Sequence, residues 1–280
     1  MTVTEALAAA VTLGLDRLDA QLLLLHALQR PATERAWLLA HDTDALTEAV
    51  QQAYLTLAQR RAAGEPLAYL VGSKAFFGLD LQVDARVLVP RPDTETLVEW
   101  ALAVLPPKAS AGVPEAPRIV DLGTGSGAIA LALKQTRPDV QVLAVDASTD
   151  ALAVARANAA SLGLVMDMQL SSWLQDVSGR FHLIVANPPY IAEGDSHLEA
   201  LRHEPRQALT AGADGLDDIR HIIGQAPAHL LPGGWLLLEH GWDQAASVRE
   251  LLSAAGLEAV QTCRDIGGNE RCSGGRARQR

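Results

Sequence analysis

Apolar residues recur at three- and four-residue steps through the first quarter of the chain, a spacing typical of amphipathic helices. One such stripe consists of Leu15, Leu18, Leu22 and Leu25. Residues 37–39 and 46–61 continue the helical pattern, and Thr2 with Glu5 fits a capping box that begins the first helix. No strand pattern interrupts this region. The sequence therefore predicts a small helical bundle, which we interpret as a domain over residues 1–75.

The periodicity changes at residue 76. Apolar and polar positions alternate from Leu79 through Leu81 to Val83, and a short apolar run follows at residues 87–89. Alternation followed by such a run indicates a β-hairpin. Pro90 and Pro92 end it, because proline cannot donate a hydrogen bond to a neighbouring strand. We interpret residues 76–92 as a hairpin linker and residues 93–280 as the second domain.

Strand and helix patterns alternate through that second domain. A helix is expected from Thr94, and residues 106–117 are a loop rich in Pro, Ala and Gly. Short apolar strands are expected at residues 118–122, 140–145, 165–170, 181–186 and 234–239. Helices are expected at residues 128–135, 151–161, 219–231 and 245–255. This alternation predicts an α/β fold with a Rossmann-like, mostly parallel sheet and helices on both faces.

Composition and charge narrow the class of protein. The 280 residues are 49% hydrophobic and 20% charged, which is ordinary for a globular protein. A formal net charge of −10 argues against a surface that grips nucleic acid through its phosphates. Cys263 and Cys272 match neither a metal-ligand spacing nor a disulfide framework, so no metal is expected. Neither a signal peptide nor a membrane span is evident, and we expect a cytoplasmic protein without a membrane partner.

A glycine-rich turn, residues 121–127 (DLGTGSG), joins the first predicted strand of this domain to its helix. The candidate cofactor-binding residues in it are Gly123, Thr124, Gly125, Ser126 and Gly127. Glycine allows the backbone to turn sharply and to approach a ligand closely, and the following helix offers free N–H groups. Asp121 precedes the glycines, and a carboxylate repels phosphate but suits an ammonium group or hydroxyls. S-adenosylmethionine has an amino-acid end, a ribose and no phosphate, so it fits this turn.

Asp146 ends the next strand, about twenty residues beyond the glycines. An acidic side chain at this position is suited to binding the hydroxyls of a ribose. The two features together predict a nucleoside-containing cofactor.

A second candidate site is the segment Asn187, Pro188, Pro189 and Tyr190, which follows the strand at residues 181–186. Open α/β sheets bind ligands at the carboxyl ends of their strands. Two prolines stiffen the loop and leave its carbonyl groups free to accept, and Asn187 adds an amide oxygen. Two such acceptors bind both hydrogens of an NH₂ group, and Tyr190 can stack on a planar group. We therefore predict methyl transfer to a planar nitrogen, with Asn187, Pro188 and Tyr190 as the catalytic residues.

These residues resemble the bacterial protein-(glutamine N5) methyltransferases of peptide chain release factors, the HemK/PrmC family. The resemblance covers nearly the whole chain. It rests on residues 61–69 (RAAGEPLAY) with Gly72, Phe76 and Gly78, residues 89–95 (VPRPDTE), residues 238–241 (LEHG) and residues 262–267 (TCRDIG) with Arg271. The Asn-Pro-Pro-Tyr segment alone leaves adenine-N6 DNA methyltransferases and RNA methyltransferases open. Residues 89–95 separate the glutamine enzymes from them.

The resemblance implies a substrate, a cofactor and their residues. The substrate is the glutamine of the Gly-Gly-Gln motif in class 1 release factors, which the N-terminal helical domain would help to hold. S-adenosylmethionine would bind at residues 123–127 and Asp146, with Trp173 near the adenine and Asn187 close to the cofactor. The glutamine would enter the site formed by residues 187–190. Ser172 and His203 depart from the family, which usually has an acidic residue and an aromatic ring there.

Three further residues and two rival functions stay open at this point. Arg91 either contacts the substrate or pairs with Asp93 or Glu95, Glu204 shapes a loop over the substrate, and His240 is interpreted as a hydrogen-bonded histidine at the core edge. One rival function is an amino methyltransferase acting on DNA or RNA. The other is a catalytically silent, cofactor-binding partner of the release factor, which the intact residues 187–190 disfavour.

Overall fold

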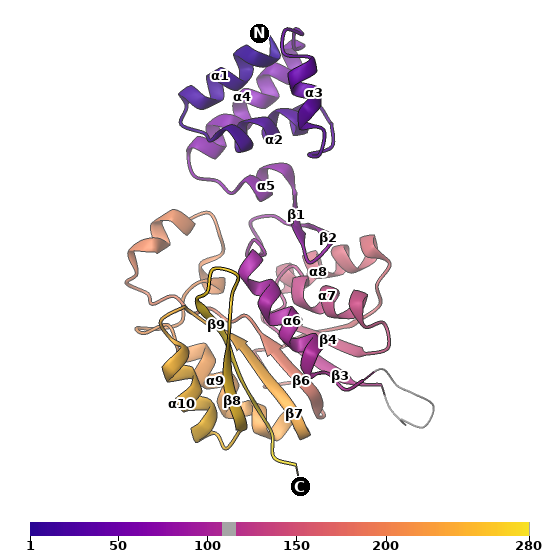
Figure 1. The fold of residues 1–280 in the computed structure, drawn as a ribbon, viewed down its shortest axis with the longest axis vertical. Helices are drawn as coiled ribbons and strands as arrows, with labels where there is room; N and C mark the ends of the chain where they lie inside the picture. The colour runs from indigo at the N-terminus through magenta and orange to yellow at the C-terminus, as the bar shows by residue number, and fades with distance from the viewer. Residues whose placement is uncertain (108–115, 280) are drawn as a thin grey trace. The chain divides into compact units, whose positions relative to one another are not determined.

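The computed structural model describes residues 1–107 and 116–279 and divides into two compact units, Met1–Ser73 and Lys74–Arg280 (Figure 1). The central part of the predicted loop at residues 106–117 lies outside the described residues.

The first unit is helical, as predicted. Its helices are α1 (Val3–Thr12), α2 (Arg17–Ala27), α3 (Arg35–Ala40), α4 (Glu48–Ala62) and α5 (Leu67–Val71). The predicted capping box of α1 is confirmed. The amide of Thr2 donates to Glu5 Oε2 across 2.8 Å, and the amide of Glu5 donates to Thr2 Oγ1 across 3.3 Å. These two bonds satisfy donors that a helix N-terminus otherwise leaves free.

The leucine stripe predicted for α2 is partly wrong. Leu15 and Leu25 are buried, but Leu18 is 48% exposed. Leu23 and Leu24, which the predicted stripe omitted, are fully buried. Four consecutive leucines fit more than one helical phase, and only packing against the other helices selects the buried face.

The predicted β-hairpin exists, but its strands are β1 (Ser73–Phe76) and β2 (Leu79–Gln82), joined by a two-residue turn. The expectation that residues 87–89 form the second strand is wrong. The amide of Val89, which would pair in a strand, donates instead to Oε2 of Glu204 across 3.1 Å. A buried side chain 115 positions away has replaced the strand partner, which local sequence cannot foresee.

The second unit is built on one seven-stranded sheet, in the order β5-β4-β3-β6-β7-β9-β8. The strands are β3 (Arg118–Leu122), β4 (Gln141–Asp146), β5 (Asp167–Leu170), β6 (Phe181–Ala186), β7 (Leu230–Glu239), β8 (Glu258–Arg264) and β9 (Glu270–Arg276). The first five strands in this order are parallel, and β9 runs antiparallel to both of its neighbours. The predicted Rossmann-like, mostly parallel sheet is confirmed.

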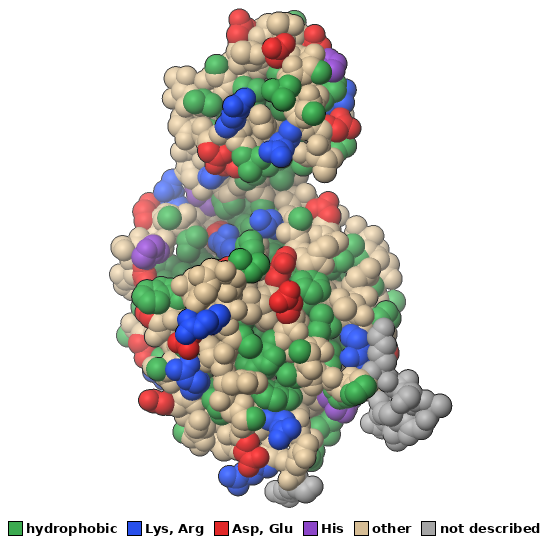
Figure 2. Space-filling view, in the orientation of Figure 1, with side chains coloured by type: hydrophobic (Ala, Val, Ile, Leu, Met, Phe, Trp, Pro, Cys, Tyr) green, Lys and Arg blue, Asp and Glu red, His purple; other side chains and the backbone are tan. Residues whose placement is uncertain are grey.

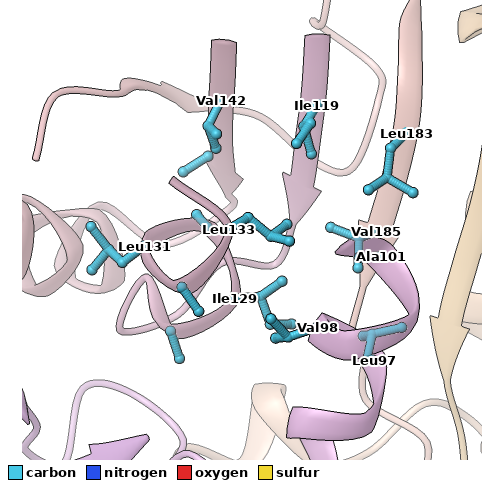
Figure 3. Close-up of a cluster of buried hydrophobic side chains, with 14 of the residues drawn as sticks. Leu97, Val98, Ala101, Ile119, Ile129, Leu131, Leu133, Val142, Leu183 and Val185 are labelled. Carbon is cyan, nitrogen blue, oxygen red and sulfur yellow. The ribbon is translucent and has the colours of Figure 1, made fainter. Parts of the chain in front are cut away.

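Helices cover both faces of this sheet (Figure 1). They are α6 (Glu95–Val104), α7 (Ala128–Thr136), α8 (Thr149–Leu162), α9 (Asp217–His229) and α10 (Ala245–Ala254). Ile119 of β3 belongs to the core beneath α6 and α7, where Val98 and Ile129 converge (Figure 3). Its neighbour Val120 belongs to the opposite core, with Ile219 of α9. The alternation of β3 side chains thus fills two separate cores.

The sequence did not predict β8 and β9. Strand β9 contains adjacent glycines, which are uncommon in strands. At Gly274 an added Cβ would lie 2.5 Å from the Leu237 side chain and 2.9 Å from the Trp100 ring. Glycine is required there because a helix and the neighbouring strand already fill the space, and this contact cannot be seen in local sequence.

The order of the strands creates a crevice at one end of the sheet. From β3 the chain proceeds to β4 and β5 on one side, and then crosses to β6 on the other side. The loops after β3 and β6 therefore diverge, and ligands of open α/β sheets bind in the resulting crevice.

Candidate functional site

A cavity of about 500 Å³ lies at the carboxyl ends of β3 to β6 in the Lys74–Arg280 unit. Its walls include these predicted site residues: Gly123, Thr124, Gly125, Ser126, Asp146, Trp173, Asn187 and Pro189. Of the other predicted residues, Gly127, Pro188 and Tyr190 are not among its lining residues. The volume is ordinary for a small-molecule site. The structure thus gathers most of the predicted residues around one space.

The buried side chain of Asp121 holds the glycine-rich turn in shape. The fully buried Oδ2 of Asp121 accepts from Thr124 Oγ1 at 2.6 Å and from the amide of Ala130 at 3.2 Å. Asp121 does not line the cavity, so the expectation that it offers its carboxylate to a ligand is wrong. Burial raises the pKa of Asp121 to about 7, and its Oδ1 has no hydrogen-bond partner among the described residues.

Asp146 faces the cavity at the end of β4. Its Oδ2 accepts from the amide of Gly125 and its Oδ1 from the amide of Ser148, both at 2.9 Å. The two amides fix the plane of the carboxylate, which keeps lone pairs available for hydroxyl groups of a ligand. Burial raises the pKa of Asp146 from its ordinary value, and these hydrogen bonds oppose the shift.

Trp173 forms another wall. Its ring lies against the backbone of Gly123, where an added Cβ would stand 3.2 Å from the ring. Its Nε1 donates to Oδ1 of Asp218 on α9 across 3.1 Å. Ser172, the position where the resemblance implied an acidic residue, also lines the cavity. A planar, apolar surface beside polar groups suits a heteroaromatic ring.

Asn187 enters the same cavity from the end of β6. Its amide nitrogen donates to Oγ1 of Thr94 across 3.2 Å, which leaves the amide oxygen as the acceptor of this side chain. Thr94 closes the 3₁₀ turn η1 (Pro92–Thr94) and also lines the cavity. Sequence reasoning missed Thr94, although it lies inside the segment 89–95 that carried the resemblance.

Tyr190 is anchored through its backbone. Its carbonyl oxygen accepts from Gln244 Nε2 across 3.0 Å. Burial raises the pKa of Tyr190. The charge of the buried Glu239, which the sequence showed only as part of the LEHG segment, raises the pKa of Tyr190 further.

Arg91 pairs with Glu204, not with Asp93 or Glu95 as the sequence suggested. The Glu204 side chain is 3% exposed and also accepts from the amide of Val89. Glu204 comes from the segment after β6, which contains the 3₁₀ turns η2 (Ser196–Leu201) and η3 (Arg206–Ala208). Because Arg91 and residues of η3 line the cavity, this pair ties two of its walls together.

His240 is confirmed as a hydrogen-bonded histidine at the core edge. It is fully buried, with Nε2 at 2.7 Å from Ser273 Oγ and Nδ1 at 2.8 Å from the carbonyl oxygen of Gly241. Burial lowers its pKa. It is therefore held by the sheet and not aimed at the cavity.

Residues 1–107 and 116–279 contain neither a metal-binding cluster nor a membrane-spanning helix. No group of His, Cys, Asp and Glu side chains has an arrangement that would hold a metal ion. No helix in these residues has the length and apolar character needed to cross a bilayer.

Comparison with known proteins agrees with this geometry. The profile of the Methyltransferase small domain matches residues 102–255, and that of the PrmC N-terminal domain matches residues 2–72. The fold is also that of a 16S rRNA N2 G1207 methyltransferase of T. thermophilus, solved with AdoMet and guanosine. That structure has a TM-score of 0.53 and 20% identity over 74% of this chain and 50% of the other. The fold and the site define an S-adenosylmethionine-dependent methyltransferase.

Curated relatives identify the family. The chain is 49% identical to a release factor glutamine methyltransferase of Xylella fastidiosa, with 97% of both chains covered. It is 50% identical to one from Bordetella pertussis, with 94% of this chain and 95% of the other covered. The chain belongs to the release factor glutamine methyltransferase family.

Proposed function

We propose that this enzyme transfers a methyl group from S-adenosylmethionine to the side-chain amide nitrogen of a glutamine in peptide chain release factors. The glutamine is that of the Gly-Gly-Gln motif in class 1 factors. The observation that carries the proposal is Asn187, whose amide oxygen is left as an acceptor in the wall of the cavity that contains Asp146. The near full-length similarity to release factor glutamine methyltransferases supports the choice of substrate.

The cofactor site is assigned to the glycine-rich turn, Asp146, Trp173 and Asn187. Residues 123–127 approach the amino-acid end of the cofactor, the Asp146 carboxylate accepts from the ribose hydroxyls, and the Trp173 ring packs beside the adenine. Bound there, S-adenosylmethionine supplies an electrophilic methyl group on a sulfonium leaving group. The cavity fits this group, because Asp146 is already oriented by the amides of Gly125 and Ser148.

The acceptor site is assigned to Asn187, Pro188, Pro189 and Tyr190. The Asn187 oxygen and a carbonyl of the proline pair each accept one hydrogen of the substrate amide. An amide nitrogen is a poor nucleophile because its lone pair is delocalised. Accepting hydrogen bonds from both N–H groups returns electron density to the substrate nitrogen. It also stabilises the positive charge that develops on this nitrogen during transfer.

Holding the nitrogen in line with the methyl group contributes as well. Such positioning lowers a barrier by up to roughly 7–11 kcal/mol in ideal cases. No general base is required of the chain, because the methylated nitrogen is strongly acidic and loses its proton to water.

Protein, not nucleic acid, is the proposed partner. The net charge is −10, and the face of the Lys74–Arg280 unit in Figure 2 shows basic and acidic side chains interspersed over its described residues. A phosphate-binding surface is usually a basic patch. We assign recognition of the release factor in part to the helical residues 1–75, and we place the enzyme in the cytoplasm, where translation ends.

The test is mass spectrometry of a purified class 1 release factor after incubation with the enzyme and S-adenosylmethionine. The expected product carries one methyl group on the Gly-Gly-Gln glutamine. A release factor with that glutamine replaced by alanine is the matched control and should gain none. Methylation at another residue would contradict the assignment.

A parallel assay with labelled cofactor separates the two rival functions. Label in added DNA or RNA, with the release factor unlabelled, would establish an amino methyltransferase of nucleic acid. Binding of cofactor and release factor without any transfer would establish a silent partner.

A further inference from the structure

Gln244 joins three loops at the carboxyl edge of the sheet through one side chain. It is the N-cap residue of α10, and its Nε2 donates to the carbonyl oxygens of Tyr190 across 3.0 Å and of Asp214 across 3.2 Å. Its Oε1 accepts from the amide of Gly241 across 2.8 Å. Tyr190 follows β6, Asp214 precedes α9, and Gly241 follows β7. The end of the acceptor loop, which we define as residues 187–190, is thus held to two other loops.

The three backbone partners fix the orientation of the Gln244 amide. A carbonyl oxygen can only accept a hydrogen bond, and a backbone N–H can only donate one. The side-chain nitrogen must therefore face Tyr190 and Asp214, and the side-chain oxygen must face Gly241. Reversing the amide would break all three hydrogen bonds. The main chain adds a fourth, from the amide of Gln244 to the carbonyl oxygen of Gly241 across 3.0 Å.

The backbone at residue 215 packs tightly against the same Tyr190 carbonyl group. Gly215 has a φ of +74°, and a Cβ added there would overlap the Tyr190 carbonyl oxygen and lie 2.9 Å from Gln244 Nε2. The left-handed backbone and the close approach both favour glycine at this position. The Tyr190 carbonyl group therefore lies between the Gln244 amide and the backbone of Gly215, which restricts its movement.

The acceptor loop can transmit this restraint because it is stiff. A proline ring holds φ near about −65°, so Pro188 and Pro189 leave the loop little internal freedom. Strand β6 positions the start of the loop, since Ala186 pairs with Leu238 of β7. Gln244 positions its end. The proline carbonyl that is proposed to accept from the substrate lies between these anchors, and a misplacement of about 1 Å can slow a reaction about 10²-fold.

We propose that Gln244 is a positioning residue for methyl transfer: it holds the Tyr190 carbonyl group, and through it the acceptor loop, where the substrate nitrogen meets the methyl group. Gln244 is not among the residues that line the cavity, so it acts through Tyr190 and need not touch substrate or cofactor. The inference rests on the proposed function, because it assumes that the acceptor loop receives an NH₂ group.

The decisive variants are Gln244→Glu and Gln244→Met, with transfer measured at saturating cofactor and release factor and well below the unfolding temperature of each variant. Glutamate has the same shape and still accepts from Gly241, but it places an oxygen against the Tyr190 carbonyl. Methionine has a similar length and makes none of these hydrogen bonds. We expect kcat to fall by about 10- to 10²-fold in both variants.

The loss should be confined to the rate of transfer. The KM for the release factor and the dissociation constant for S-adenosylmethionine, measured by calorimetry, should change far less than kcat. The reason is that the glycine-rich turn and Asp146 keep their own hydrogen bonds. A purely structural role would instead lower the unfolding temperature and leave kcat of the folded enzyme unchanged.

Gln141→Glu and Gln141→Met are the matched controls. Gln141 is exposed at the first residue of β4, at the opposite end of that strand from Asp146. The same chemical changes there should leave kcat at the wild-type value. Equal kcat in wild type and the Gln244 variants, or equal losses in the Gln244 and Gln141 variants, would overturn the inference. No transfer by the wild type would instead overturn the proposed function.

Discussion

The backbone amide of Gly125 donates a 2.9 Å hydrogen bond to Oδ2 of Asp146, a residue 21 positions further along the chain. This bond joins the loop after β3 to the end of β4. The proposed site for the amino-acid end of the cofactor and the proposed site for its ribose are therefore one connected unit, and a change at Asp146 reaches both.

Replacing Asp146 should weaken cofactor binding. Asp146→Ala removes the proposed acceptor of the ribose hydroxyls and leaves the amides of Gly125 and Ser148 without their partner. Hydrogen bonds to a charged group contribute about 1.5–3 kcal/mol, so the dissociation constant for S-adenosylmethionine should rise by about 10-fold or more in calorimetry. Asp150→Ala, an exposed change in the first turn of α8, is the control and should bind normally. Unchanged affinity of Asp146→Ala would remove Asp146 from the site.

Replacing Asn187 should slow methyl transfer much more than it weakens cofactor binding. Asn187→Ala removes the acceptor oxygen, and kcat should fall by about 10²–10³. Cofactor affinity should fall far less than kcat, because the turn at residues 123–127, Asp146 and Trp173, which form the rest of the assigned cofactor site, are intact. Asn187→Asp keeps an acceptor oxygen but loses the hydrogen bond to Thr94. Its kcat should therefore lie between those of wild type and Asn187→Ala. Equal activity in wild type and Asn187→Ala would contradict the assigned role.

Glu204 should hold two walls of the cavity together. Glu204→Ala leaves the Val89 amide and the Arg91 guanidinium without their acceptor. We expect faster proteolysis within residues 191–212 and a higher KM for S-adenosylmethionine. Glu199→Ala, in the same segment, removes only a surface pair with Arg202, in which Glu199 is 82% exposed, and should leave both unchanged. Equal proteolysis rates and equal KM values in Glu204→Ala and Glu199→Ala would contradict this role of Glu204.

Stability should depend on pH through Asp121. Burial raises its pKa from 3.8 to about 7, so the folded state holds this proton more tightly than the unfolded state. The resulting stability is present below about pH 4 and is lost as pH rises through about 7. A shift of about 3 pKa units corresponds to no more than about 4 kcal/mol.

The measurement is urea unfolding at pH 5 and pH 8. Wild type should lose more stability between these values than Asp121→Asn, which cannot ionise. A smaller loss is expected to remain in the variant, because burial also raises the pKa of Glu239 to about 7. Identical pH dependence in the two proteins would show that Asp121 does not titrate in this range.

Much of the fold was readable from local patterns because its parallel strands are short apolar runs. Strands such as β3 and β6 are buried on both faces, and their hydrophobicity marks them without any knowledge of their neighbours. The capping box of α1 is equally local, since Thr2 and Glu5 lie three residues apart. The carboxyl ends of these strands then predicted where the site would be.

Local sequence patterns did not predict the elements whose structure depends on distant partners. Strand β9 contains Gly274 because Trp100 of α6 fills the space above it. The apolar residues 87–89 look like a strand, but Glu204 accepts the amide of Val89. In both places a contact across more than one hundred positions overrides the local pattern.

The sequence by itself determined the chemistry of this protein: a glycine-rich turn, Asp146 one strand later, and an Asn-Pro-Pro-Tyr loop. These signals are local, because each depends on backbone geometry at the end of a single strand. Only the tertiary structure decided how that chemistry is oriented. It turned Asp121 inward, paired Arg91 with Glu204, and placed the Thr94 hydroxyl beside the Asn187 amide. The direction of a side chain depends on the hydrogen-bond partners that folding brings beside it, and those partners come from other strands and loops.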